Sequence, residues 1–197
     1  NSETDFVAKN ASFQEFVSAV AATVGKQNPA DVEALNNMIL DGTNDTVKDA
    51  LNDKILTIGE KLTIRRFVRY EGHVVSYIHG GGTIGVLVNL DTDDATAAKA
   101  ECTSAGKDIA MQIAAMNPQY LDKASVPSES IEKEKEILLA QALNEGKPQN
   151  IAEKMVMGRI AKYYKEVCLL EQAFVKDDEI SVGKFAENTA KEIGPFA

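Results

Sequence analysis

The spacing of apolar residues changes along the chain and predicts helices first, then strands, then helices again. A strand-like run, Thr4 to Val7, opens the sequence. From Phe13 to Val24 apolar residues recur at the three- and four-residue spacing of an amphipathic helix. Ser12 and Glu15 form a capping box for this helix, and Gly25 is expected to end it.

Two further helices are expected before the spacing changes. A short helix restarts at Asn28-Pro29-Ala30, and its apolar side comprises Val32, Leu35 and Ile39. The run Asp41 to Asn44 is typical of a turn. A second amphipathic helix then runs from Val47 to Ile58 and ends at Gly59.

The spacing of apolar residues then becomes two, which is the spacing of strands. We expect strands over Leu62–Tyr70, His73–His79 and Thr83–Leu90. Glu71-Gly72 and Gly80-Gly81-Gly82 connect them as short turns, so the three strands predict an antiparallel meander.

Helical spacing returns after Asp94. Residues Ala95–Asn117 read as one alanine-rich helix or two, expected to lie across the meander and to end before Pro118. Two amphipathic stretches, Ile131–Leu143 and Ile151–Val167, flank a short break and predict an antiparallel helical hairpin.

The chain is expected to return to extended backbone before its last helix. The apolar stretch Leu169–Val175 predicts this extended segment. Ser181 is then expected to cap the last helix. The inward face of that helix comprises Val182, Phe185, Ala186 and Ile193.

Composition narrows the class of protein. Of the 197 residues, 44% are hydrophobic and 26% charged, which is ordinary for a globular protein, and the net charge is −9. An acidic chain repels phosphate backbones, so we expect no direct nucleic-acid partner. The best basic cluster, Arg65, Arg66 and Arg69, is split between strand faces and is expected to form salt bridges. Cys102 and Cys168 are far apart, which suits a reducing cytosol, and no stretch is apolar enough to span a membrane.

Two motifs resemble ligand-binding loops, but the residues that follow each motif do not fit such a loop. Gly80, Gly82 and Gly85 satisfy G-x-G-x-x-G, but a dinucleotide loop must lead into a helix, and this one leads into a strand. Asp91, Asp93 and Asp94 resemble the start of a calcium loop that lacks its later glycine and glutamate. We expect the acidic run to cap a helix instead.

The two histidines lie on one predicted strand. His73 and His79 are six residues apart, too far for a joint metal site without further ligands, and no nucleophile motif accompanies them. His79 stands at the lip of the glycine loop, where recognition residues usually lie.

An ordered set of motifs across nearly the whole chain resembles translation elongation factor Ts. The motifs are Thr4-Asp5-Phe6-Val7-Ala8-Lys9-Asn10, Ile58-Gly59-Glu60, Ile64-Arg65-Arg66, Tyr77-Ile78-His79-Gly80-Gly81-Gly82, Ile84-Gly85-Val86-Leu87-Val88, Asp108-Ile109-Ala110-Met111-Gln112, Asn117-Pro118, Gly146-Lys147-Pro148, Ile151-Ala152-Glu153-Lys154-Met155-Val156, Gly158-Arg159 and Gln172-Ala173-Phe174-Val175. Each motif is weak alone, and their order makes the set specific.

The resemblance implies a guanine nucleotide exchange factor for the GTPase elongation factor Tu. It implies no enzyme chemistry, no cofactor and no bound metal. In the family, the residues matching Asp5 and Phe6 intrude near the magnesium and phosphate site of the GTPase, and His79 makes a related insertion. The full set of expected partner contacts is Thr4, Asp5, Phe6, Val7, Ile58, Gly59, His79, Gly80, Phe174 and Val175.

The resemblance also implies the architecture. We expect an α+β fold with two subdomains, each a small antiparallel sheet covered by helices, at 1–72 and at 73–121 with 168–197. Residues 122–167 match the inserted helical hairpin, or coiled coil, through which a homodimer is possible. The family's N-terminal ubiquitin-associated-like domain and final strand have no counterpart in this sequence. Lys176 replaces an apolar residue of some members, and the missing initiator Met indicates a fragment.

A rival hypothesis needs no exchange activity. The chain would then be a helical scaffold that binds proteins through the hairpin. For either function we expect a cytoplasmic protein, bacterial rather than organellar.

Overall fold

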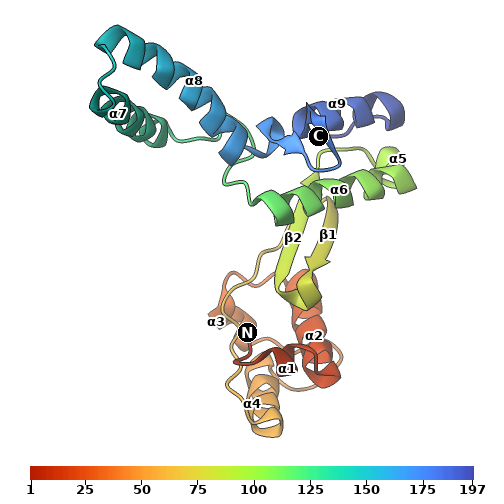
Figure 1. The fold of residues 1–197 in the computed structure, drawn as a ribbon. Coiled ribbons are helices and arrows are strands. Elements are labelled where there is room, and N and C mark those ends of the chain that lie inside the picture. Colours follow the sequence, from red (N-terminus) through yellow and green to blue (C-terminus); the bar gives the residue numbers. More distant parts are fainter. The chain divides into compact units, whose positions relative to one another are not determined.

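The computed structural model describes all 197 residues and divides into two compact units (Figure 1). The first comprises residues 1–71 and 79–84, and the second comprises residues 72–78 and 85–197. Both units are mainly helical, and the two small antiparallel sheets belong to the second, which confirms the α+β class. None of the helices combines the length and apolar character that crossing a bilayer requires.

The first unit is built on helices. Its elements are α1 (Asp5–Ala8), α2 (Ala11–Gln27), α3 (Val32–Asn36), α4 (Val47–Ile58) and the 3-10 turn η1 (Gly80–Gly82). Phe16 and Val24 of α2 pack with Leu35, Leu40 and Val47 in its core. The expected helix Val47–Ile58 is confirmed, and Gly59 ends it in the left-handed conformation at φ 79°.

The second unit holds both sheets. Its elements are β1 (His73–His79), β2 (Ile84–Leu90), α5 (Asp94–Ala97), α6 (Ala100–Met116), α7 (Ser128–Asn144), α8 (Gln149–Val167), η2 (Leu169–Glu171), β3 (Ala173–Phe174), β4 (Asp177–Ser181) and α9 (Val182–Ile193). β1 pairs with β2, and β3 pairs with β4 in antiparallel register, with Ala173 opposite Ser181. The tip of the β1–β2 hairpin belongs to the first unit.

Helix α6 packs closely on the β1–β2 sheet, as its alanine content predicts. A Cβ on Gly106 would lie 2.7 Å from Cγ2 of Val75, so only glycine allows this approach. Cys102, Ala105 and Ile109 of the same helix join the core that α9 closes from the other side. The core of the second unit therefore lies between a sheet and two helices.

The predicted N-terminal strand is wrong, because Asp5 to Ala8 form the short helix α1. Four residues carry too little periodicity to separate strand from helix. Thr4 remains extended and precedes the first turn, where the carboxylate of Asp5 suits the helix dipole. Asp5 and Phe6 therefore diverge by about 100° around a helix rather than lying on opposite faces of a strand.

The predicted strand Leu62–Tyr70 is also wrong, so the three-strand meander is a two-strand hairpin. The segment is irregular, and it joins the N-terminus through Thr63, whose N–H donates to the carbonyl of Asn1 at 3.0 Å. Leu62 is buried, and Ile64 and Phe67 pack on the first core. Because their spacing is two and then three, no single strand face could bury all of them.

Several boundaries differ from the predictions because asparagine and aspartate replaced the expected capping residues. Asn10, not Ser12, caps α2 by accepting from the N–H of Phe13, and α2 continues past Gly25 to Asn28 at φ 47°. The next helix is likewise capped by Asp31. It ends at Asn36, so Ile39 lies outside it and is exposed.

Towards the C-terminus the outcomes are mixed. Of the two alternatives for residues 95–117, one helix or two, the structure has two, α5 and α6, and Asn117 ends the second. Ser181 caps α9 as predicted. The segment Leu169–Val175, predicted to be extended, begins with the η2 turn and is extended only after it. The strand β4 was not predicted, because its exposed, charged residues form no apolar face.

Candidate functional site

The predicted contact residues near the N-terminus are brought together by one carboxylate. The backbone N–H and the hydroxyl of Thr4 both donate to Glu60, at 3.1 and 2.5 Å. Glu60 directly follows Gly59, so this bond pair places α1 beside the end of α4. We call Thr4–Val7 with Ile58–Gly59 the N-terminal contact region.

Within this region α1 presents its aromatic residue to solvent. The side chain of Phe6 is 87% exposed, whereas Val7 is buried and anchors the helix. Asp5, next to it, is exposed as well. A large apolar ring and a carboxylate thus stand together on a helix held at both ends, by Thr4 on one side and by the hydrogen bond from the N–H of Asn10 to Val7 on the other.

Sequence reasoning missed Leu56 in the same region. Its side chain is 82% exposed on α4, and Ile58 is half-buried. The signal was present, since Leu56 is an apolar residue outside the stripe formed by Val47, Leu51, Ile55 and Ile58. Leu56 and Phe6 are thus two large apolar side chains that the first unit leaves exposed.

The second predicted contact is the tip of the β1–β2 hairpin. Gly80 has φ 58°, and a Cβ there would clash with the hydroxyl oxygen of Thr83. That hydroxyl donates to the carbonyl of Gly80 at 3.1 Å. The tight turn holds His79 exposed at the end of β1 and leads into β2. A strand after the glycine turn confirms that the loop does not have the form of a dinucleotide site.

The third predicted contact is the turn between β3 and β4. Phe174 is buried, and its ring stacks on Phe185 with centroids 4.3 Å apart. Val175 is 43% exposed. Of this pair, only the Val175 side chain reaches the surface, while Phe174 anchors the turn to the core.

Two glutamines to which the sequence assigned no role hold this turn. Gln112 of α6 is fully buried and donates through Nε2 to Oε1 of Gln172 and to the carbonyl of Ala173, each at 3.1 Å. Its Oε1 accepts from the N–H of Val175 at 2.8 Å. Gln172 in turn donates to the carbonyl of Glu166 at 2.9 Å. The sequence did contain a sign of this role, since Gln112 lies within the apolar stripe of α6, where a polar side chain must be buried.

The acidic run after β2 caps a helix, as predicted. Asp93 accepts from the N–H of Thr96 at 2.7 Å, and this hydrogen bond lowers the pKa of the Asp93 carboxyl. Asp94 pairs with His73, with Oδ1 and Nε2 3.2 Å apart. No three histidine, cysteine or acidic side chains of the chain gather as a metal site would require.

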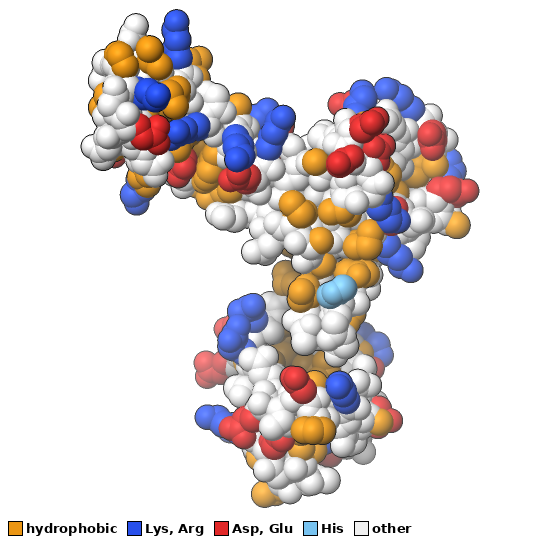
Figure 2. All heavy atoms as spheres, viewed as in Figure 1, with side chains coloured by type: hydrophobic (Ala, Val, Ile, Leu, Met, Phe, Trp, Pro, Cys, Tyr) orange, Lys and Arg blue, Asp and Glu red, His pale blue; other side chains and the backbone are white.

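The remaining surface features are the basic cluster Arg65, Arg66 and Arg69 and the helical hairpin of α7 and α8. Arg69 pairs with Glu71 at 2.5 Å, in line with the salt-bridge prediction, while Arg65 and Arg66 are exposed. Helices α7 and α8 pack on each other. Figure 2 shows basic, acidic and apolar side chains mixed over the visible face of each part, so no single-sign charged surface stands out there.

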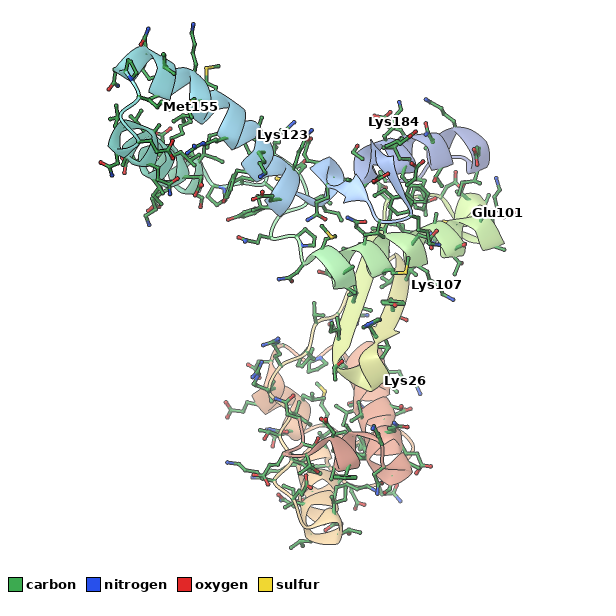
Figure 3. All side chains as sticks on the ribbon, viewed as in Figure 1. Lys26, Glu101, Lys107, Lys123, Met155 and Lys184 are labelled. Atoms are coloured by element: carbon green, nitrogen blue, oxygen red, sulfur yellow. The ribbon has the colours of Figure 1, made fainter.

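Lys123 ties the start of the hairpin to its end. Its Nζ lies 2.7 Å from the carboxylate of Glu171 and 5.9 Å from the ring centre of Tyr164, which explains its place beside the last turns of α8 in Figure 3. The hydrogen bond with Glu171 raises the pKa of the Lys123 ammonium group. The two ends of the hairpin therefore meet at one ion pair.

Comparison with known proteins identifies the family. The family model described as "Elongation factor TS" matches residues 3–197. The chain is 51% identical over 200 residues to elongation factor Ts of Syntrophotalea carbinolica and 52% identical over 197 residues to that of Clostridium perfringens. Each alignment covers 98% of this chain and 64% of the relative, so the chain spans about two thirds of their length. This chain belongs to the elongation factor Ts family.

Proposed function

We propose that this chain binds the GTPase elongation factor Tu and promotes release of its GDP, as a guanine nucleotide exchange factor in translation elongation. Family membership supports this function. The observation that carries it is Phe6, 87% exposed on a short helix that Thr4 and Val7 hold in place. An aromatic ring left in water on a fixed element is suited to enter a partner.

The proposed activity requires differential affinity rather than chemistry. The chain must bind the nucleotide-free GTPase more tightly than the nucleotide-bound form. By linkage, the nucleotide then weakens the chain's binding by the same factor as the chain weakens the nucleotide's. A catalytic acid, base or cofactor has no part in this exchange.

Each contact region has a separate role in the proposal. Phe6 wedges between elements of the GTPase, and Asp5 displaces polar partners near its magnesium and phosphate site. Loss of magnesium removes a charge that bridges phosphate oxygens, so the nucleotide leaves faster. His79 at the hairpin tip makes a second insertion, and Val175 docks on another part of the same partner. Ile58, Gly59 and Gly80 form the backbone beside these side chains.

The test is release of a fluorescent GDP analogue from elongation factor Tu. The parent chain is expected to accelerate release, and Phe6→Ala is expected to reduce its efficiency about tenfold, as truncation of a buried aromatic contact does. Met157→Ala is the control, because Met157 is 75% exposed on α8, outside the three predicted contacts. Equal activity of Phe6→Ala and parent would contradict the proposed role of α1.

Two further variants separate the remaining hypotheses. Asp5→Asn tests charge, since unchanged release would show that the carboxylate's charge does not matter. Deletion of residues 122–167 tests the scaffold hypothesis and the proposed homodimer. If that deletion abolished binding while Phe6→Ala preserved it, the hairpin would be the working surface and exchange would be rejected.

A further inference from the structure

The turn Phe174–Lys176 is fastened to one face of α6. Asp108 and Gln112 are four residues apart, so they lie one above the other on this helix. Gln112 holds Ala173 and Val175, and Asp108 pairs with Lys176, whose Nζ lies 2.6 Å from Oδ1. Each of the three turn residues therefore has its own attachment. Phe174 stacks on the ring of Phe185, Val175 is bound by Gln112, and Lys176 is bound by Asp108.

The two attachments differ in their surroundings. Gln112 is fully buried, and each of its side-chain polar atoms has a partner, so its amide cannot rotate without leaving buried groups unpaired. The Asp108–Lys176 pair is half-exposed and therefore weaker. The orientation of the Gln112 amide follows from this network, since Oε1 must accept from Val175 and Nε2 must donate to two oxygens.

We propose that Asp108 and Gln112 are positioning residues that hold Val175 in the orientation in which it meets elongation factor Tu. The inference rests on the proposed function. Val175 has its backbone N–H bound to Gln112 while its side chain remains 43% exposed. A side chain presented from an immobilised backbone loses little conformational freedom on binding, which favours affinity. Lys176 thus has a partner inside this chain rather than being only a replacement for an apolar residue.

Gln172 provides a matched control for Gln112. It is equally buried and belongs to the same network, but its own bonds run to Gln112 and to the carbonyl of Glu166, not to Val175. Gln112→Met and Gln172→Met both remove a buried amide of similar size. Only the first removes the acceptor of the Val175 N–H.

The first readout is hydrogen exchange of single backbone amides in the full chain. Gln112→Met is expected to speed exchange at the Val175 amide about tenfold, while the Val182 amide, bound to the carbonyl of Gln172, changes much less. Gln172→Met is expected to leave the Val175 amide protected. Equal exchange at Val175 in the two variants would overturn the proposal.

The second readout is GDP-analogue release from elongation factor Tu at varied concentrations of the chain. Gln112→Met is expected to raise the half-saturating concentration about tenfold and to leave the saturated rate unchanged, because Phe6 and His79 are untouched. In a Val175→Ala background the same substitution is expected to have no further effect. An effect that persists in this background, or a fall in the saturated rate alone, would overturn the proposal.

Lys176→Ala is a second test, which does not depend on whether Gln112→Met folds, because it removes only the half-exposed pair with Asp108. This exposed change is expected to raise the half-saturating concentration about twofold and to speed Val175 exchange. No change in either quantity would overturn the role of the α6 face. A parent chain that neither binds nor accelerates release would contradict the proposed function, while the amide measurements would still decide whether α6 orders the turn.

Discussion

The N-terminal contact region and the β3–β4 turn place an aromatic residue in opposite ways. Phe6 stands in solvent on a helix of four residues, which Thr4 ties to the half-buried Glu60. Phe174 is buried against Phe185, held by the buried amide of Gln112 next to it. One region leaves its aromatic side chain in solvent, and the other buries its aromatic side chain beneath the turn that carries Val175.

The two aromatic residues differ in burial, although the family resemblance implies a partner contact for both. A family motif marks both Phe6 and Phe174 as contact residues without distinguishing them. Their burial does, because a ring in the core cannot touch a partner without opening the core. Substitutions in the two regions should therefore affect different measurements.

The largest expected effect is on stability. Phe174→Ala is expected to lower the free energy of unfolding by about 3–5 kcal/mol, because it removes a buried ring from a packed core. Phe6→Ala is expected to change it by less than about 0.5 kcal/mol, because the exposed ring loses little packing. Urea denaturation followed by circular dichroism measures both, and similar losses in the two variants would break the comparison.

A smaller effect is expected when the Glu60 tether is weakened. Glu60→Gln removes the charge from the acceptor of two Thr4 hydrogen bonds, and charge-assisted bonds are stronger than neutral ones. We expect exchange efficiency to fall about threefold with little loss of stability, since α1 would present Phe6 less firmly. Glu15→Gln, an exposed change on α2, is the control. If Glu60→Gln matched this control, the tether would have no part in exchange.

Both cysteines lie in the second unit, so their rate of alkylation measures how often the core of that unit opens. Cys102 and Cys168 are both buried in the second unit, and burial raises the pKa of each thiol. Alkylation by iodoacetamide should therefore be slow in the parent and in Phe6→Ala, and faster in Phe174→Ala, where the core opens more often. Rapid alkylation of the folded parent would contradict the burial of these thiols.

The same thiols predict the smallest effect, a loss of stability at alkaline pH. Because their pKa is raised in the folded state, the folded chain keeps protons that the unfolded chain releases. This contribution is fully present below the pKa of the unfolded thiols and is lost as the pH rises through the folded pKa. Cys102→Ser with Cys168→Ser should flatten the alkaline limb of a stability–pH curve measured by urea denaturation, and an unchanged limb would contradict this assignment.

Elements with long, regular patterns were predictable. The helix Val47–Ile58 has its apolar stripe, and its end at Gly59 needs only local backbone geometry. The hairpin strand His73–His79 was found to the residue, because β-branched and aromatic residues fill it between two glycine turns. Short or mixed segments failed, since Thr4–Val7 and Leu62–Tyr70 contain no periodicity that outweighs their tertiary contacts.

The sequence alone determined the family, the α+β class and the residues expected to meet a partner, because ordered motifs and local periodicity are written in the chain itself. Only the tertiary structure decided which of those residues are available. It buried Phe174, left Phe6 exposed, and joined Thr4 to Glu60 and Gln112 to Val175 across 56 and 63 positions of sequence. Burial and long-range hydrogen bonds depend on which elements pack together, and no local pattern specifies that.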